Sequence, residues 1–572
     1  MTNADIAAIL EHIAVLLEFK GENPFRIRAY RNAARAVRDC PRTVAQMLDD
    51  PQAPLTDMPG IGKDLAEKIG HLVRTGTTPI YDELCAEIPE SVLAILRIPG
   101  LGPKRAAVIF HELGIATLEQ LRQACHEQRI RGLKGFGAKM EATILEGLSI
   151  ASEAERRILW AEADVHAQAL LAHLGKEPGV RRAEVAGSYR RRKETVGDLD
   201  VLVVADDPAA AMDHMLSYPS VAEILAHGAT KTSFRLTSRL QVDVRVVPDE
   251  SFGAALQYFT GSQAHNIVLR GMAKARGLKI NEYGVYSGES QIAGRTEEEV
   301  YAALDLPCFA PELREARQEF HWAESGKLPK LIQLDDIQGD LHMHSTWTDG
   351  LLSIEEMAAA ARQRGLKYIA ITDHSKRAAM VGGLDSARLL EQWAQIDQLN
   401  QSDPGITVLK GVEVDILEQG GLDIEDEVLA QADWVVASVH FGQSQPRQRI
   451  TERILGALAN PYVCVLAHPT GRLLTRRKPY EVDLEAVIQA ARDHGKCLEL
   501  NAHPSRLDLD DVACAAAQAA GVPVVISTDA HSMDGLAAMR YGINQARRGG
   551  LTAKDVLNTL SWNKVRKRLP RP

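Results

Sequence analysis

The chain has 572 residues and a formal net charge of −10 at pH 7. This length predicts several domains, and an acidic total does not exclude DNA binding, which depends on local basic patches. The odd number of cysteines, seven, and the lack of a Cys-x-x-Cys spacing favour reduced thiols over a disulfide framework. No apolar run reaches the length of a membrane helix and no signal-peptide pattern is present, so we expect a cytoplasmic protein without a membrane partner.

The first third of the chain repeats a Gly-x-Gly turn before a helix-like run, at residues 55–63, 98–104 and 133–139. Glycine permits the tight turn and lets backbone N–H groups approach a phosphate, and the start of the next helix adds positive charge. One such turn would be a weak signal, whereas three predict a helix-hairpin-helix region that holds DNA without reading bases. The expected DNA contacts are Gly60, Gly62, Gly100, Gly102, Gly135, Gly137, Lys63, Lys104 and Lys139.

A run of arginines precedes the first of these turns and is opposed only by Asp39. We interpret it as a basic helix face that adds phosphate contacts, while a solvated helix surface remains the alternative. The run consists of Arg26, Arg28, Arg31, Arg35, Arg38 and Arg42.

Acidic residues lie on two predicted strands in the middle of the chain. Asp198 and Asp200 are two residues apart on one strand, so both side chains point to one face, and Asp243 lies on another strand at residues 240–247. Strands disfavour isolated aspartates, and three converging carboxylates repel each other unless cations lie between them. We therefore predict a two-metal site for nucleotidyl transfer. A solvated strand edge is the alternative for the first two aspartates taken alone.

Together with the turn Gly187-Ser188-Tyr189-Arg190-Arg191, this segment resembles the nucleotidyltransferase palm of family X DNA polymerases, of which DNA polymerase beta is a familiar member. The resemblance runs from about Val185 to Glu312. It implies that the three aspartates hold Mg²⁺ or Mn²⁺ and that dNTPs are substrates. One position departs from the eukaryotic relatives, because Gln241 stands where they carry arginine. The residues implied to contact the incoming nucleotide and the nascent pair are Ser188, Arg191, Tyr258, Phe259, Gly261, Asn266 and Arg270.

The N-terminal third is similar to the lyase-type and fingers domains of the same family. The similarity places Lys68 where repair polymerases carry a Schiff-base lysine, which attacks the sugar aldehyde of an abasic site. Asp64 and Arg26 stand where the eukaryotic relatives have supporting lysines. Abasic-site lyase activity and a simple phosphate contact are therefore both open for Lys68.

Seven short apolar segments between residues 339 and 531 carry a histidine or carboxylate at or just after their ends, and helix-like stretches separate them. This alternation predicts a parallel sheet closed as a barrel, in which chemistry lies at the C-terminal ends of the strands. Imidazole with carboxylate suits zinc, manganese or iron better than magnesium or calcium alone. His503 is excluded, because Asn-Ala-His-Pro fits an ordinary turn. The candidate ligands are His342, His344, Asp349, His374, Glu413, His440, His468, Asp529 and His531.

These motifs resemble those of the polymerase-and-histidinol-phosphatase (PHP) domain, from about Leu334 to the C-terminus. Members of that family cut phosphate esters as phosphatases or exonucleases, so the resemblance implies up to three manganese, zinc or iron ions and a 3′–5′ exonuclease activity. The implied ligand sets are His342, His344, Glu413 and Asp529 for one ion, Glu413, His440 and His468 for a second, and Asp349, His374 and His531 for a third.

The segments together predict a multidomain chain with an all-α helix-hairpin-helix region, an α+β palm with a thumb, and an α/β PHP barrel of the distorted TIM type. The expected domains are a lyase-like DNA-binding domain at 1–85, a fingers-type domain at 86–152, the palm and terminal nucleotide-binding subdomain at 153–315, a linker at 316–334 and the PHP domain at 335–572.

The resemblances imply a monomeric DNA-directed DNA polymerase that fills short gaps in DNA repair, acts on gapped or nicked duplex DNA at the nucleoid, and degrades 3′ ends. One alternative is a nucleotidyltransferase for RNA or a small molecule joined to a histidinol-phosphatase-type enzyme, which the helix-hairpin-helix copies weigh against. The other is a non-catalytic DNA-end-binding protein, which the complete aspartate and nine-residue sets weigh against.

Overall fold

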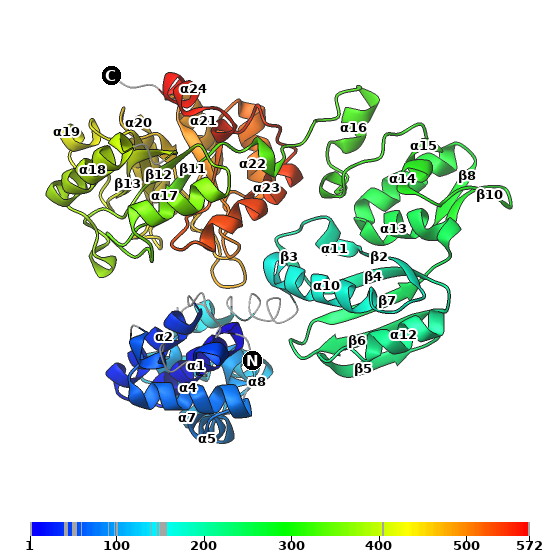
Figure 1. Cartoon of the computed structure of the whole chain (residues 1–572), viewed down its shortest axis with the longest axis horizontal. Coiled ribbons are helices and arrows are strands. Elements are labelled where there is room, and N and C mark those ends of the chain that lie inside the picture. The colour runs from blue at the N-terminus through cyan, green and yellow to red at the C-terminus, as the bar shows by residue number, and fades with distance from the viewer. Residues whose placement is uncertain are drawn as a thin grey trace. The chain divides into compact units, whose positions relative to one another are not determined.

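The computed structural model describes two parts of the chain, Met1–Arg156 and Arg157–Pro572, and each is treated by itself (Figure 1). Among the described helices, none is long and apolar enough to cross a membrane. The described residues are 3–38, 44–48, 54–58, 60–89, 91–96, 98, 101–138, 140–145, 148, 157–402 and 405–569.

The first part is helical throughout its described residues. In α4, Leu65, Ile69 and Leu72 recur at helical spacing and are buried, which anchors one face of the helix in the core. Gly76, with φ 80°, ends α4 and donates its N–H to the Leu72 carbonyl at 2.8 Å. The helices are α1 (Asn3–Phe19), α2 (Pro24–Arg38), α3 (Val44–Leu48), α4 (Lys63–Thr75), α5 (Pro79–Glu87), α6 (Val92–Leu96), α7 (Pro103–Leu113) and α8 (Leu118–His126).

The second part begins with a five-stranded mixed sheet in the order β2-β4-β7-β6-β5. Its strand β4 is covered on both faces, by α10 and α12 on one side and by α13 on the other. Strands β4 and β7 run parallel, so their ends lie together. The bounds are α10 (Trp160–Leu174), β2 (Val180–Val185), β4 (Asp198–Ala205), α12 (Pro208–Leu216), β5 (Val221–His227), β6 (Lys231–Leu236), β7 (Gln241–Val246) and α13 (Phe252–Thr260).

A smaller subdomain follows the sheet, with a three-stranded antiparallel sheet packed on α13 and α14. The stretch predicted as a linker, 316–334, contains the short helix α16, and Ile332 within it is buried. The predicted domain limits remain predictions. The elements of this region are α14 (Gln263–Ala275), β8 (Leu278–Asn281), β9 (Gly284–Ser287), β10 (Ser290–Ala293), α15 (Glu297–Ala302) and α16 (Glu319–Glu324). The short helix α11 (Gly187–Arg190) belongs to the preceding five-stranded sheet, where it contacts β4.

Seven parallel strands, β11 to β17, form the C-terminal barrel in chain order, with helices around them (Figure 1). The barrel closes where His344 N–H donates to the Ala530 carbonyl and Asp529 N–H donates to the His342 carbonyl, both at 2.9 Å. This confirms the predicted TIM-like barrel. The strands are β11 (Gly339–Met343), β12 (Tyr368–Ile371), β13 (Thr407–Asp415), β14 (Trp434–Ser438), β15 (Val465–Leu466), β16 (Cys497–Asn501) and β17 (Val524–Ser527). The helices are α17 (Ile354–Gln363), α18 (Ser386–Gln401), α19 (Asp426–Leu429), α20 (Arg447–Ala459), α21 (Leu484–Asp493), α22 (Asp511–Ala520), α23 (Met539–Arg548) and α24 (Trp562–Arg568).

Candidate active sites

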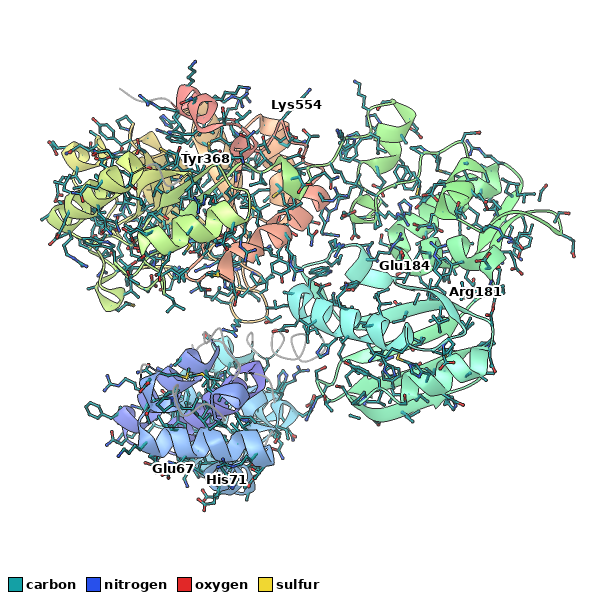
Figure 2. All side chains as sticks on the ribbon, viewed as in Figure 1. Glu67, His71, Arg181, Glu184, Tyr368 and Lys554 are labelled. Carbon is teal, nitrogen blue, oxygen red and sulfur yellow. The ribbon has the colours of Figure 1, made fainter. Side chains whose placement is uncertain are left out.

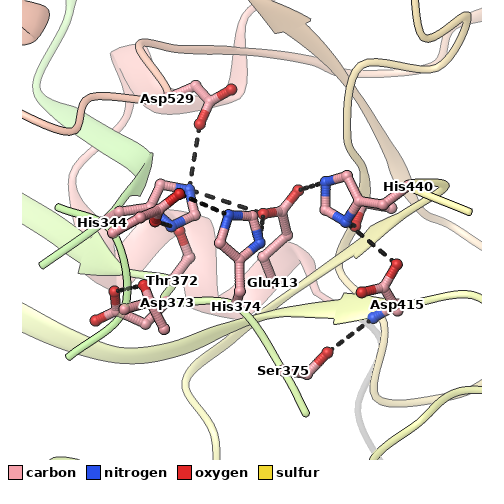
Figure 3. A network of polar contacts seen from close by, with 12 residues as sticks. His344, Thr372, Asp373, His374, Ser375, Glu413, Asp415, His440 and Asp529 are labelled. Atoms are coloured by element: carbon pink, nitrogen blue, oxygen red, sulfur yellow. Dashed lines mark hydrogen bonds and ion pairs between the residues drawn. The ribbon is translucent and has the colours of Figure 1, made fainter. Parts of the chain in front are cut away.

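The nine predicted barrel ligands lie together at the C-terminal ends of the strands. Figure 3 shows Glu413 of β13 among His344, His374, His440 and Asp529. Glu413 is only 1% exposed. Its Oε2 lies 2.8 Å from His374 Nδ1, and its Oε1 lies 3.2 Å from His440 Nε2 and 3.1 Å from His468 Nε2. His342 and His344 approach the same carboxylate at 3.6 and 3.7 Å. One carboxylate therefore faces five histidines.

Two further carboxylates flank this centre. Asp529 Oδ1 lies 3.2 Å from His344 Nε2, and Asp349 Oδ2 lies 3.4 Å from His531 Nε2 and 3.6 Å from His374 Nε2. Ligand atoms within 4.8 Å of one another form three sets among the described residues. They differ in part from the sets implied by resemblance, because His344 and His374 each belong to two of them and His468 belongs to none. The sets are His344, Asp349, His374 and His531; His342, His344 and Asp529; and His374, Glu413 and His440.

The cluster fits metal ions, because many of its buried polar atoms lack a hydrogen bond in the described structure. An unsatisfied buried polar group costs about 1–3 kcal/mol, and cations placed among these atoms would satisfy several at once. The atoms are His342 Nε2, His344 Nδ1 and Nε2, Asp349 Oδ1, His374 Nδ1, Glu413 Oε2 and His468 Nδ1.

Proton affinities in the cluster agree with a site built for cations. Burial alone would lower the pKa of His374, but the adjacent Glu413 carboxylate outweighs it and raises that pKa to about 11. Burial, together with the nearby imidazoles of His531 and His374, lowers the pKa of His344 to about 3. The carboxylates thus favour positive charge beside them, and a bound cation would take the place of a proton there.

Two buried carboxylates outside the predicted set orient its histidines. Glu499 of β16 accepts a hydrogen bond from His342 Nδ1 at 2.7 Å and another from the His468 backbone N–H at 2.7 Å. Asp415 of β13 accepts from His440 Nδ1 at 3.2 Å. Such partners fix the ring orientation of metal-ligating histidines. The sequence signal was present, because both carboxylates lie on strands that carry or adjoin ligands. His503 is exposed, and its Nδ1 lies 2.8 Å from Ser505 Oγ.

The palm aspartates lie on the parallel pair β4–β7, where Asp200 and Asp243 are register partners. Burial, reinforced by the carboxylates of Asp198 and Asp243, raises the pKa of Asp200 to about 7. The pKa of Asp198 is also raised, by burial and then by Asp243. Their ligand atoms do not form a set within 4.8 Å in the described residues. Asp243 instead accepts hydrogen bonds from Ser233 Oγ and from Gln241 Nε2, the latter at 2.9 Å. The pKa values of Asp198 and Asp200 are raised because these buried carboxylates repel one another, and a bound cation would relieve that repulsion.

The turn that contains Gly187 and Ser188 lies in close contact with Asp200 of the aspartate triad. Gly187 has φ 65°, and a Cβ added there would lie 2.8 Å from Asp200 Oδ2, so only glycine fits. The next residue, Ser188, has a buried Oγ without a hydrogen-bond partner among the described residues. A buried hydroxyl left free beside a carboxylate cluster fits a phosphate-binding position.

The other predicted nucleotide-binding residues form a contiguous set near this turn. Arg191 donates from Nε to Glu315 Oε1 at 3.2 Å and from Nη1 to the Thr260 carbonyl, next to Gly261. Asn266 Nδ2 donates to the Tyr258 carbonyl at 2.8 Å, and Arg270 Nε donates to the Asn266 carbonyl at 3.2 Å. The ring of Phe259 lies 4.8 Å from the Arg245 guanidinium.

The first helix-hairpin-helix turns have the backbone that phosphate binding needs. Gly62 and Gly102 are the N-caps of α4 and α7, no side chain caps either helix, and both glycines are exposed. The N-cap residues therefore offer no side chain to the first N–H groups of either helix. Gly60 and Gly135 have φ of 80° and 86°, Gly137 is exposed, and Lys63 and Lys104 are exposed. Gly100 and Lys139 lie outside the described residues, as does Arg42, and so do the side chains of Arg35 and Arg38.

The basic face is partly neutralised within its own domain. Arg31 pairs with Glu18 at 2.6 Å, Arg26 lies 3.6 Å from Glu22, and the Arg28 guanidinium lies 4.7 Å from the centre of the Phe25 ring.

Lys68 lies on α4, the helix whose Glu67 and His71 are labelled in Figure 2. Its Nζ donates to Asp64 Oδ2 at 2.6 Å. Burial alone would lower the pKa of Lys68, but Asp64 and Tyr30 together outweigh burial and raise that pKa. The amine is therefore held in its charged form, which is not nucleophilic.

Comparisons with known proteins cover every part of the chain. Family models match a helix-hairpin-helix domain at residues 1–78, a helix-hairpin-helix tandem at 92–149, the DNA polymerase beta palm at 157–260, the DNA polymerase beta thumb at 255–315 and the PHP domain at 340–503. DNA polymerase lambda of Rattus norvegicus is 27% identical over 346 residues, which cover 55% of this chain and 56% of the relative. A probable phosphatase of Thermoanaerobacter sp. (strain X514) is 31% identical over 231 residues, 38% of this chain and 89% of the relative.

The relative named DNA polymerase/3'-5' exonuclease PolX, from Bacillus subtilis (strain 168), is 41% identical over 569 residues, 99% of each chain. Identity at this level extends over the helix-hairpin-helix, palm, thumb and PHP segments alike. It confirms the resemblance to family X DNA polymerases and the resemblance to the PHP domain. The chain therefore belongs to the PolX family, the family X DNA polymerases that carry a C-terminal PHP domain.

Proposed function

We propose that the protein is a DNA polymerase that fills short gaps in duplex DNA during repair and removes nucleotides from 3′ ends with its PHP domain. Membership of the family brings metal dependence and DNA binding with it. The observation that carries the proposal is the presence of two separate carboxylate centres in one chain, the palm triad on β4 and β7 and the nine-residue cluster around Glu413.

In the palm, Asp198, Asp200 and Asp243 would hold Mg²⁺ or Mn²⁺, and the bound cations supply positive charge for phosphoryl transfer. The free Ser188 hydroxyl can donate to a phosphate oxygen, and the Arg191 guanidinium can bind the triphosphate of a dNTP. Tyr258, Phe259 and Gly261 would bound the sugar pocket. Asn266 and Arg270 would contact the nascent pair and the template strand.

In the barrel, the nine residues would hold up to three manganese, zinc or iron ions, which when bound supply Lewis-acid charge for cutting a phosphate ester. Glu413 would contribute to holding these ions together with His374 and His440, which face its two oxygens. Glu499 and Asp415 fix the rings of His342 and His440 through their Nδ1 atoms.

The helix-hairpin-helix turns would grip the backbone of gapped or nicked DNA without reading sequence, and the protein would act as a cytoplasmic, nucleoid-associated monomer. For Lys68 we favour a phosphate contact over a Schiff base, because its bond to Asp64 keeps the amine protonated. The helix-hairpin-helix turns weigh against an enzyme for small molecules.

A labelled one-nucleotide-gapped duplex tests the proposal. With Mg²⁺ or Mn²⁺ and dNTPs the primer should grow by one nucleotide, and with Mn²⁺ alone it should shorten from its 3′ end. A chelator should stop both reactions, and added metal should restore them. Failure to extend the gapped primer under any of these cations would refute the polymerase, and failure to shorten it would refute the nuclease.

A further inference from the structure

Helix α23 of the PHP domain makes polar contacts with the polymerase part of the same compact unit. Arg547 Nε donates to Glu312 Oε1 at 2.8 Å, and Gln545 Nε2 donates to Glu194 Oε1 at 2.6 Å. The ring of Tyr541 lies 5.9 Å from that of Trp160, edge to face. The interface therefore extends along the helix, and its last residue, Arg548, reaches the nucleotide-binding turn.

Arg548 is buried, with 3% of its side chain exposed, and its guanidinium joins three segments. Nη1 donates to the Arg191 backbone carbonyl at 2.8 Å and to Glu315 Oε1 at 3.1 Å, while Nη2 donates to Asp511 Oδ2 at 2.6 Å. Arg191 ends the short helix α11, which contains Ser188. One PHP side chain thus holds the end of the phosphate-binding turn.

Arg548 also contacts Glu315, the carboxylate that pairs with the Arg191 guanidinium. Glu315 Oε1 accepts from Arg191 Nε at 3.2 Å as well as from Arg548. A carboxylate with a single arginine partner can take both N–H donors of that guanidinium in a bidentate pair. A triphosphate binds arginine in the same bidentate way, so the carboxylate and the triphosphate would compete for Arg191. Sharing Glu315 between two guanidinium groups weakens its hold on Arg191. Without Arg548, Asp511 would still pair with Arg317 at 3.2 Å, whereas Glu315 would pair with Arg191 of the nucleotide site at 3.2 Å. Loss of Arg548 would therefore act on the nucleotide site through Glu315.

We propose that Arg548 is a positioning residue of the polymerase site: it fixes the Arg191 carbonyl and occupies Glu315, which leaves the Arg191 guanidinium available for the triphosphate of the incoming dNTP. This inference rests on the proposed role of Arg191 in nucleotide binding. The contact makes the PHP domain a structural part of the dNTP site, apart from its own phosphoesterase chemistry.

The test is steady-state insertion of one nucleotide into a gapped duplex by the full-length protein. Arg548→Gln, which keeps most of the side-chain volume but no charge, should raise KM for dNTP on the order of tenfold, with kcat little changed. The double variant Arg548→Gln/Glu315→Gln should return KM most of the way to the wild-type value, because the competing charge is gone and only the bond to the Arg191 carbonyl stays lost. A purely structural role for Arg548 would not be rescued in this way.

Arg547→Gln is the matched control, since Arg547 is the next residue of the same helix but contacts Glu312 and the Ile332 carbonyl instead. Its KM for dNTP should stay at the wild-type value. All variants should still remove 3′ nucleotides. This activity serves as the control that the barrel is folded. If Arg548→Gln loses the nuclease too, Arg548→Lys replaces it and should raise KM about threefold, because an ammonium group cannot reach all three partners.

An unchanged KM in both Arg548 variants, or a raised KM that Glu315→Gln does not restore, overturns the proposal. Arg191→Ala separates this failure from that of the underlying assignment. If Arg191→Ala leaves KM for dNTP unchanged, the nucleotide-binding role of Arg191 is wrong. If Arg191→Ala raises KM and Arg548→Gln does not, only the role of Arg548 is wrong.

Discussion

Glu413 is the residue on which the barrel site depends most, because its two oxygens contact imidazoles delivered by four other strands. A carboxylate buried this deeply would be costly without cations or protonated rings around it. Glu499 and Asp415 each accept a hydrogen bond from one of these imidazoles, Glu499 from His342 and Asp415 from His440.

Glu499→Gln should weaken the nuclease without removing a ligand. The amide can no longer accept two charge-assisted bonds from His342 and the His468 backbone, so metal affinity or 3′-end removal should fall roughly 10–100-fold. The measurement is nuclease rate against Mn²⁺ concentration. Glu427→Gln, an exposed acid on the same barrel, is the control and should match wild type. Wild-type metal dependence in Glu499→Gln would contradict the orienting role.

Lys68 should give little Schiff-base trapping at neutral pH, because its raised pKa keeps the amine charged. Borohydride trapping on a duplex with a 5′-deoxyribose phosphate measures this. Asp64→Ala removes the bond that raises the pKa, so the uncharged fraction at a given pH should increase, and any trapped product with it. Strong trapping in wild type, unchanged in Asp64→Ala, would mean that Lys68 is a lyase nucleophile despite Asp64.

At the scale of elements, the sequence predicts the barrel well because each buried parallel strand is a continuous apolar run that ends in a polar residue. The palm is harder to predict, because the alignment of Asp200 with Asp243 depends on β4 and β7 being parallel neighbours. The intervening β5 and β6 join the same sheet beyond β7, an order that local patterns do not encode. The resemblance to a family supplied that pairing.

The turn before β4 gives an element-scale prediction. Gly187→Ala places a Cβ 2.8 Å from Asp200 Oδ2 at a φ of 65°, and that backbone alone costs about 1–2 kcal/mol for an alanine. Nucleotide insertion should fall sharply while 3′-end removal continues. Gly456→Ala in α20, where a Cβ would meet nothing within 4 Å, should leave both activities intact. Normal insertion by Gly187→Ala would show that this turn can relax away from the triad.

At the scale of the whole molecule, the order of functional parts could be predicted from the sequence, since each part has its own local motif. The contacts of α23 with the polymerase part could not, because Arg548 and Glu315 are 233 residues apart and each resembles an ordinary surface charge in sequence. Separate motifs therefore predicted two centres, while their joint support of the dNTP site emerges only from the folded chain.

The central claim is that one chain carries two independent metal-dependent centres. It is tested most directly by inactivating each centre in turn and measuring both activities. A labelled gapped duplex is incubated with wild type, Asp200→Ala and His440→Ala, each with dNTPs and without. The account predicts that Asp200→Ala shortens the primer but does not extend it, and that His440→Ala extends it but does not shorten it. Loss of both activities in either soluble, folded variant would contradict the account, because it would mean that a single site performs both reactions.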